Sequence, residues 1–165
     1  MNGSESLNEV FDSNWKKPAI ISENQNFNYG ELYSKAAGIV DWLVKQSCLP
    51  GDCVALRLLN SWQFAVAYLA GILGKYCLIP VNLALSLDDQ AYILKLTKPK
   101  IILDDESFIA SLSPRKCYEP NFDYPKGEIL SIFFTSGSTG NPKGVCHTLD
   151  ALVGNAVAFN SSQNL

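Results

Sequence analysis

Residues 132–148 read IFFTSGSTGNPKGVCHT, and the rest of the chain is organised around this stretch. Its first three residues are apolar and favour a β-strand, which must end at Thr135, where glycines and hydroxyl side chains take over. Residues 135–144 hold four hydroxyl side chains, three glycines, Pro142 and Lys143. Glycines let backbone N–H groups converge on an anion, and hydroxyl and ammonium groups add donors. The pattern predicts a phosphate-binding loop that follows a buried strand.

Three other motifs for phosphate binding or nucleophilic catalysis do not match this stretch. A Walker A loop requires Ser or Thr directly after its lysine, but Gly144 follows Lys143. The glycine spacing differs from the dinucleotide-binding fingerprint G-x-G-x-x-G. A nucleophile elbow needs glycine two residues before its serine, whereas Ser136 precedes Ser138 at that distance.

The segment TSGSTGNPKGV, residues 135–145, resembles the phosphate-loop signature of the AMP-forming, adenylate-forming enzymes. These include acyl-CoA synthetases, 4-coumarate-CoA-ligase-like and luciferase-like enzymes, and adenylation domains of nonribosomal peptide synthetases. The resemblance implies binding of ATP with Mg²⁺, attack of a carboxylic acid on the α-phosphorus, and transfer of the acyl group to CoA or another thiol. The residues that it implies for binding the ATP phosphates are Thr135, Ser136, Gly137, Ser138, Thr139, Gly140 and Lys143. Lys143 would neutralise charge on the leaving pyrophosphate.

His147 is the only histidine of the chain. Many relatives read V-x-H-T-H here, but Leu149 stands where the second histidine would be. Two interpretations remain open for His147: a direct catalytic role, or a partly buried ring that a backbone group satisfies, which is the commoner case. We expect Cys146 to be a small buried hydrophobe.

Length, net charge and cysteine content argue against several classes of protein. A chain of 165 residues has the length of one domain, and its net charge of −3 argues against a nucleic-acid or anionic membrane partner. Five cysteines, an odd number without a C-x-x-C pair, argue against a disulfide scaffold or a zinc site and favour the reducing cytoplasm. The apolar run at 64–81 is interrupted by Gly71, Lys75 and Pro80, so we expect core elements, with no membrane span.

The order of the predicted elements indicates an α/β fold, with a parallel or mixed sheet covered by helices. Strands are expected at 53–58, 76–81, 101–103 and 129–134, with a helix at 29–46 before the first strand and helices at 62–73 and 86–95 between the first three. Asn28, Ser61 and Ser86 are candidate N-caps. We expect a further helix at 149–159 that turns Leu152, Val153, Ala156 and Phe159 inward.

Two segments lack strong periodicity. Residues 1–17 are expected to form a loose N-terminal segment with a short turn near Phe11, and 104–127 a variable connection that contains three prolines. FNYGEL at 27–32 and YLAGILGKYCLIPVNLALSLDDQAYILKLTKPKIILDD at 68–105 also resemble the adenylate-forming family, so the resemblance spans roughly residues 18–160. It implies that residues 1–165 are the N-terminal part of the large domain of an AMP-dependent synthetase or ligase.

The resemblance leaves several functional hypotheses open. In relatives, the adenine pocket, the ribose-binding aspartate, the acyl pocket and the catalytic C-terminal lysine come after the region matched here. We therefore expect part of an acid–thiol ligase, similar to acyl-CoA synthetases, that is inactive by itself; its substrate in the complete enzyme is a small-molecule carboxylic acid. The alternatives are a non-catalytic module that binds ATP or phosphate and regulates another protein, and a non-functional remnant.

Overall fold

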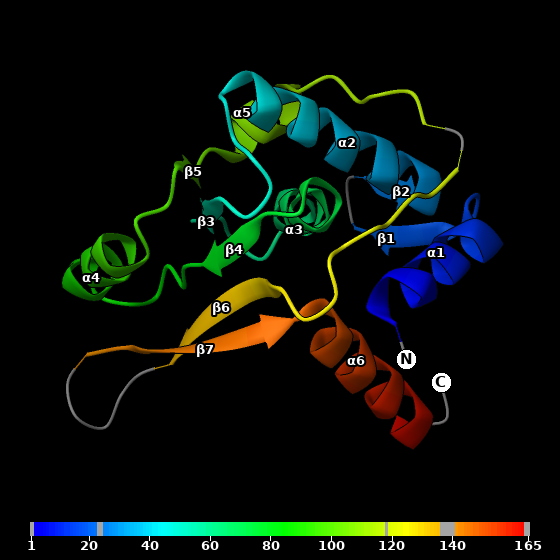
Figure 1. Ribbon diagram of the computed structural model, residues 1–165. Coiled ribbons are helices and arrows are strands. Elements are labelled where there is room, and N and C mark those ends of the chain that lie inside the picture. The colour runs from blue at the N-terminus through cyan, green and yellow to red at the C-terminus, as the bar shows by residue number, and fades with distance from the viewer. Residues whose placement is uncertain (1, 23–24, 118, 136–140, 164–165) are drawn as a thin grey trace.

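The structure is a computed structural model, and it describes residues 2–22, 25–117, 119–135 and 141–163. Figure 1 shows the path of the chain. The elements are α1 (Gly3–Asn14), β1 (Pro18–Ile21), β2 (Asn26–Asn28), α2 (Tyr29–Lys45), β3 (Cys53–Leu56), α3 (Trp62–Gly74), β4 (Cys77–Pro80), α4 (Leu87–Thr97), β5 (Ile101–Leu103), α5 (Glu106–Ser111), β6 (Ile129–Thr135), β7 (Lys143–Thr148) and α6 (Leu149–Gln163). None of the helices in the described part of the chain has the length and apolar character needed to cross a membrane.

One five-stranded sheet forms the centre of the molecule, in the order β5-β3-β4-β6-β7. The first four strands run parallel, and β7 pairs antiparallel with β6. Parallel neighbours need long crossovers, which α3 and α4 supply between β3, β4 and β5. The strands β1 and β2 form a separate antiparallel hairpin. This arrangement confirms the predicted α/β fold with a mixed sheet.

One face of the sheet packs against α2 and α3, and we call it the covered face. Val54, Leu56 and Leu78 point from β3 and β4 into a large cluster that includes Ile39 and Leu43 of α2. α3 comes so close to the sheet that a Cβ atom on Gly71 would lie 2.5 Å from the Leu78 side chain. Glycine is therefore required at residue 71 by packing.

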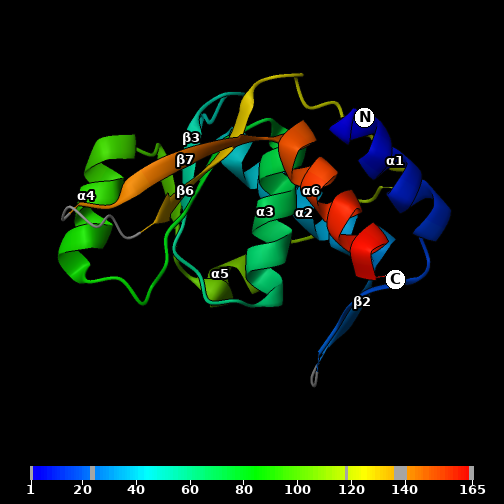
Figure 2. The ribbon, with the colours of Figure 1, turned by 90° about the horizontal axis from the view of Figure 1, so that it is seen from below.

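The opposite face, which we call the open face, has less cover. Figure 2 shows α4 on one side of the strands and α2 and α3 on the other. Ala55 of β3 and Ile79 of β4 are fully buried there, together with Ile93 of α4. Farther from α4, Cys77 and Ile132 are only half-buried.

The predicted helix caps are confirmed. The Asn28 side chain accepts a hydrogen bond from the Glu31 N–H (2.8 Å), and the Glu31 carboxylate accepts one from the Asn28 N–H (2.9 Å), which completes a capping box. Ser61 and Ser86 cap α3 and α4 in the simpler way, by accepting one backbone N–H each. The strands β3 and β4 are shorter than expected, because the chain turns away after Leu56 and Pro80.

The first 17 residues differ from the loose segment that the sequence predicted. They contain the 12-residue helix α1, which begins after an Asn2 cap. Phe11 is only 5% exposed, because it packs edge-on against the rings of Tyr29 and Phe122. Aromatic partners distant in sequence therefore stabilise a helix whose own apolar pattern is weak.

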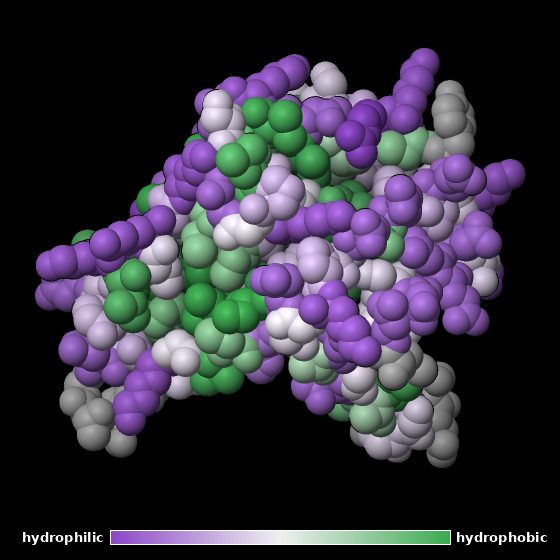
Figure 3. All heavy atoms as spheres, viewed as in Figure 1, coloured by the Kyte–Doolittle hydropathy of each residue, from purple (hydrophilic) through white to green (hydrophobic). Residues whose placement is uncertain are grey.

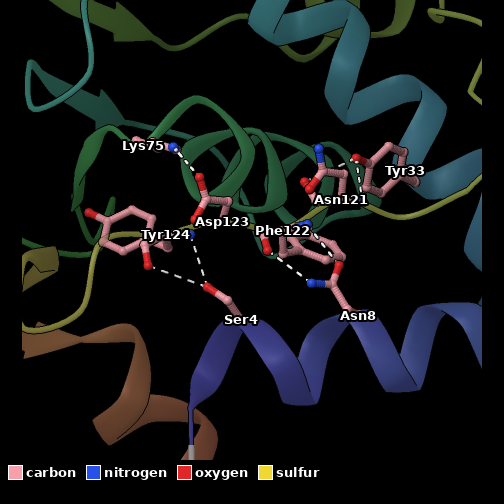
Figure 4. A network of polar contacts seen from close by, with 8 residues as sticks. All are labelled: Ser4, Asn8, Tyr33, Lys75, Asn121, Phe122, Asp123 and Tyr124. Carbon is pink, nitrogen blue, oxygen red and sulfur yellow. Dashed lines mark hydrogen bonds and ion pairs between the residues drawn. The ribbon is translucent and has the colours of Figure 1, made fainter.

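Residues 121–124 form an extended segment that side chains of α1 and α2 hold in place, and we call it the strap (Figure 4). Asn8 exchanges two hydrogen bonds with the backbone of Phe122, at 2.8 and 2.9 Å. The Ser4 hydroxyl accepts from the Tyr124 N–H at 2.9 Å, and the Tyr33 hydroxyl accepts from the Asn121 N–H at 3.0 Å. The strap therefore satisfies its backbone groups through side chains, without joining a sheet.

Candidate functional site

The carboxyl ends of β3, β4 and β6 meet at one edge of the sheet, where ligands bind in open α/β folds. A cavity of about 580 Å³ opens there. Figure 3 shows apolar side chains gathered in this part of the molecule, between α4 and β6. The residues that line the cavity are Leu58, Leu59, Asn60, Phe64, Pro80, Val81, Asn82, Leu83, Ala84, Phe133 and Phe134.

The phosphate-loop stretch begins and ends at this edge. Because β6 runs parallel to β4, it brings Thr135 to the carboxyl side of the sheet. Thr135 pairs with Lys143 across the antiparallel β6–β7 ladder, and both residues are exposed. The pairing therefore holds a hydroxyl and an ammonium group at the two ends of the connection. The predicted site residues Ser136, Gly137, Ser138, Thr139 and Gly140 lie outside the described residues.

The expected loop at 135–144 is shorter at its C-terminal side than the sequence suggested. Lys143 and Gly144 belong to strand β7, where Gly144 pairs with Phe134. A Cβ atom on Gly144 would lie 2.9 Å from the Ile132 side chain. Close packing on the open face thus gives Gly144 a structural role, independent of any anion.

The positive charge of Lys143 has no carboxylate partner among the described residues. Four cations of the described residues form ion pairs, as in the contacts of Lys75 with Asp123 and of Lys100 with Asp52, both 2.9 Å. Among the described residues no carboxylate forms an ion pair with Lys143. An exposed lysine of this kind, beside a hydroxyl at a sheet edge, suits a phosphate oxygen.

His147 lies on β7, beside β6. Its ring is partly buried and meets Phe133 edge-on, with ring centroids 5.4 Å apart. None of the side-chain hydrogen bonds between described residues involves His147, so its expected backbone partner stays a prediction. Phe133 lines the cavity, and the ring of His147 therefore lies behind the cavity wall.

Two residues near His147 differ in their surroundings. Leu149 is buried against the start of α1, where a Cβ on Gly3 would lie 2.8 Å from it. The position serves packing in this chain. Cys146 was expected to be buried, but it is exposed because it lies on the edge strand β7, which has no neighbour beyond it in the sheet.

Ser131 is a buried polar residue that sequence reasoning did not single out. It is fully buried in β6 and accepts a hydrogen bond from the Tyr68 hydroxyl at 3.0 Å. Burial raises the pKa of Tyr68, although this hydrogen bond acts in the opposite direction, so Tyr68 remains a neutral donor. The pair ties α3 to the strand that leads to Thr135.

Sequence reasoning also missed the polar residues of the cavity. Asn60 and Asn82 each follow a buried parallel strand, which was the signal that could have placed them at this edge. A second hollow of about 510 Å³ at the same edge holds Arg57 and Asp104, an ion pair at 3.7 Å. Glu106 in that hollow accepts hydrogen bonds from the Leu59 N–H and the Ser61 hydroxyl, so it stabilises the turn before α3. The residues that the structure describes contain no group of three or more potential metal ligands.

Comparisons with known proteins identify the family and similar folds. A dimodular nonribosomal peptide synthase of Bacillus subtilis (strain 168) is 30% identical over 153 residues, which cover 77% of this chain and 6% of that protein. The fold matches O-succinylbenzoate coenzyme A synthetase (MenE) of Bacillus subtilis in complex with AMP, with a TM-score of 0.81, 19% identity, and coverage of 99% of this chain and 46% of that one. The same enzyme in complex with ATP and magnesium gives a TM-score of 0.80 at 18% identity, over 99% and 47% of the two chains.

The chain thus spans less than half the length of these solved chains and a small share of the peptide synthase. The family model described as AMP-binding enzyme matches residues 8–165. Since this match takes in nearly the whole chain, the protein belongs to the AMP-binding enzyme family.

Proposed function

We propose that this chain supplies the part of an AMP-forming acid–thiol ligase, of the acyl-CoA synthetase type, that binds the phosphates of ATP. The observation that carries the proposal is the pairing of Thr135 with Lys143 at the carboxyl edge of the sheet. Both side chains are exposed there, and Lys143 has no carboxylate partner among the described residues. The membership of the AMP-binding family, and a relative solved with ATP and magnesium, support a nucleotide as the ligand.

In this proposal the hydroxyl groups of Thr135, Ser136, Ser138 and Thr139 donate hydrogen bonds to the β- and γ-phosphates. Gly137 and Gly140 let the backbone approach them closely. Lys143 neutralises the negative charge that develops as pyrophosphate leaves, which is electrostatic catalysis without a covalent intermediate on the protein. Mg²⁺ would be bound mainly through the phosphates, a mode that needs no cluster of protein carboxylates.

The other reactants proposed are a carboxylic acid and CoA or another thiol. A structural relative whose name describes it as a coenzyme A synthetase supports this choice. We further propose that the chain by itself binds ATP without forming an acyl-adenylate. A binding module that regulates another protein is the second candidate, and turnover by a complete protein that contains this chain would distinguish a ligase from it.

ATP binding to the purified chain, measured by titration calorimetry with and without Mg²⁺, tests the phosphate site. In Lys143→Ala the affinity should fall by about tenfold or more, since a charge-assisted hydrogen bond contributes about 1.5–3 kcal/mol. Lys126→Ala is the matched control, because Lys126 is equally exposed but lies before β6, at the opposite end of that strand. Unchanged affinity in a folded Lys143→Ala variant would contradict the proposal.

A second measurement tests catalysis. Pyrophosphate release is followed after adding ATP, Mg²⁺ and a panel of carboxylic acids to the purified chain. We expect none above the background without protein. Release that depends on one acid and on Lys143 would show that the chain alone is a competent adenylating enzyme.

A further inference from the structure

Two cysteines lie side by side on the open face of the sheet. Cys53 begins β3 and Cys77 begins β4, and their Cα atoms are direct partners in the parallel ladder. Both side chains pack against the cluster beneath α4, so both point to the same face. Neighbouring strands are about 4.7–4.9 Å apart. This spacing falls within the range of about 4.4–6.8 Å between the Cα atoms of disulfide-bonded cysteines.

The pair is accessible to small molecules. Cys53 and Cys77 are both half-buried and line a cavity of about 560 Å³ at the amino ends of the strands. Lys75, Tyr124 and Glu128 contribute polar atoms to the same cavity. A reagent can therefore reach the thiols without unfolding of the sheet.

Cys53 and Cys77 are better suited to react as a dithiol than to bind a metal ion. Burial and the adjacent Cys53 thiol raise the pKa of Cys77 to about 12, so its thiolate is scarce at neutral pH. Among the described residues, no histidine, further cysteine or carboxylate joins Cys53 and Cys77 in a group that could hold a metal ion. Two thiols that lie side by side can instead exchange with an existing disulfide, a reaction that begins when a thiolate attacks one of the disulfide sulfurs.

We propose that Cys53 and Cys77 form a modification site for small-molecule disulfides, at which exchange produces an intramolecular Cys53–Cys77 disulfide. The two thiols lose two protons and two electrons, and a sulfur–sulfur bond forms between them. The sulfur–sulfur bond of the small disulfide breaks, and its halves take up those protons and electrons and leave as two thiols. No other oxidant is required.

Two of the three remaining cysteines, Cys146 and Cys48, provide internal controls. Cys146 lies on β7, and β6 separates that strand from β4, so it is about two strand spacings, roughly 10 Å, from Cys77 and too distant for a direct bond. Cys48 is buried, and only four residues separate it from Cys53. In an unfolded chain the short Cys48–Cys53 loop would close most readily. The identity of the bonded pair therefore reports whether the sheet register directs the reaction.

The full chain is incubated in buffers with increasing ratios of oxidised to reduced glutathione at pH 8, quenched with acid, alkylated and digested. We expect one dominant linked peptide pair, Cys53–Cys77, with the intact mass lower by two hydrogens and a higher Tm. Cys53→Ser and Cys77→Ser should each lose the link, and Cys146→Ser should keep it. Alanine variants at residues 53 and 77 repeat the test with an apolar side chain, in case a buried hydroxyl impairs folding.

Three outcomes would overturn the proposal. One is a chain that keeps its native circular dichroism spectrum but forms no Cys53–Cys77 link at any glutathione ratio. Another is a dominant Cys48–Cys53 link, which would mean that the unfolded chain reacts. The third is a mixture that includes Cys146 in proportion to its exposure.

Discussion

The two faces of the sheet differ in how completely helices cover them. On the covered face, α2 and α3 bury Leu56 and Leu78 in one large cluster that also takes in Phe11 of α1 and Phe122 of the strap. On the open face, α4 buries a cluster of only four residues, and Ile132 stays half-exposed. The covered face therefore supplies most of the stability, whereas the open face leaves side chains accessible to ligands and reagents.

The largest expected loss of stability comes from a core truncation, which can be compared between the two faces by shortening one side chain on each. Leu78 is 1% exposed, so Leu78→Ala should lower the free energy of unfolding by about 2–5 kcal/mol, through lost burial and the cavity left beside Gly71. Ile132→Ala should cost clearly less, because solvent already reaches part of that side chain. Urea unfolding followed by circular dichroism measures both. Equal losses would mean that the open face is as stabilising as the covered one.

The next largest loss of stability is expected when the strap, which covers the sheet on the side of α1, loses its contacts with α1. Asn8→Ala removes both hydrogen bonds to the backbone of Phe122, a residue only 2% exposed. Leaving buried backbone groups unpaired should cost about 1–3 kcal/mol. The neighbouring Glu9→Ala is the control, and it should change stability by less than about 0.5 kcal/mol, since Glu9 is exposed. If the two variants are equally stable, water replaces Asn8 and the strap contributes little.

The strap also shows what sequence alone could not provide. Residues 1–17 and 104–127 each lack a strong pattern, and their order comes from contacts between residues more than 100 positions apart, such as Asn8 with Phe122. Local reasoning had no access to such pairs. By contrast, the cap at Asn28 and the strand at 101–103 follow from local residue types and were predicted correctly.

The same difference between local patterns and long-range contacts explains why predictions of burial near the C-terminus were wrong. The periodicity of α6 suggested that Ala156 and Phe159 face inward, but both are exposed, because the part of α6 that packs on the core lies near Leu152 and Val153. Cys146 looked like a core residue by type, yet its place on an edge strand exposes it. At the candidate site, the motif was enough to single out Thr135 and Lys143, whereas Asn60 and Asn82 join them only through the sheet topology.

A smaller loss of stability is expected when a helix cap is removed, and this change can be made separately in α4 on the open face and in α2 on the covered face. Ser86→Ala removes the hydrogen bond from the Asp89 N–H that caps α4, and Asn28→Ala removes the corresponding cap of α2. Each change should cost about 1 kcal/mol. Hydrogen exchange should then accelerate in the first turn of α4 alone in Ser86→Ala, and in the first turn of α2 alone in Asn28→Ala. Faster exchange in both helices in either variant would show that the two layers open together.

The smallest effect lies at the amino edge of the strands, which belongs to neither face. Asp52 accepts a hydrogen bond from the Leu49 N–H at 2.8 Å and one from the Lys100 ammonium group at 2.9 Å, and these two contacts lower the pKa of its carboxyl group. A carboxylate whose pKa is lower in the folded chain stabilises that state above its unfolded pKa of about 3.9, and the contribution is lost as the pH falls through the folded value.

The Tm advantage of the native chain over Asp52→Asn should therefore be constant from about pH 7 to 5 and shrink below about pH 4. Asp12→Asn is the control, because Asp12 is exposed and lies on α1, away from this edge. The effect should be small, since the solvent around Asp52 screens its charge. Equal Tm values of the native chain and Asp52→Asn at pH 7 would mean that the backbone hydrogen bond, which asparagine also accepts, holds the edge without help from the charge. In that case turn geometry stabilises this part of the amino edge, and the ion pair of Lys100 with Asp52 contributes only marginally to the fold.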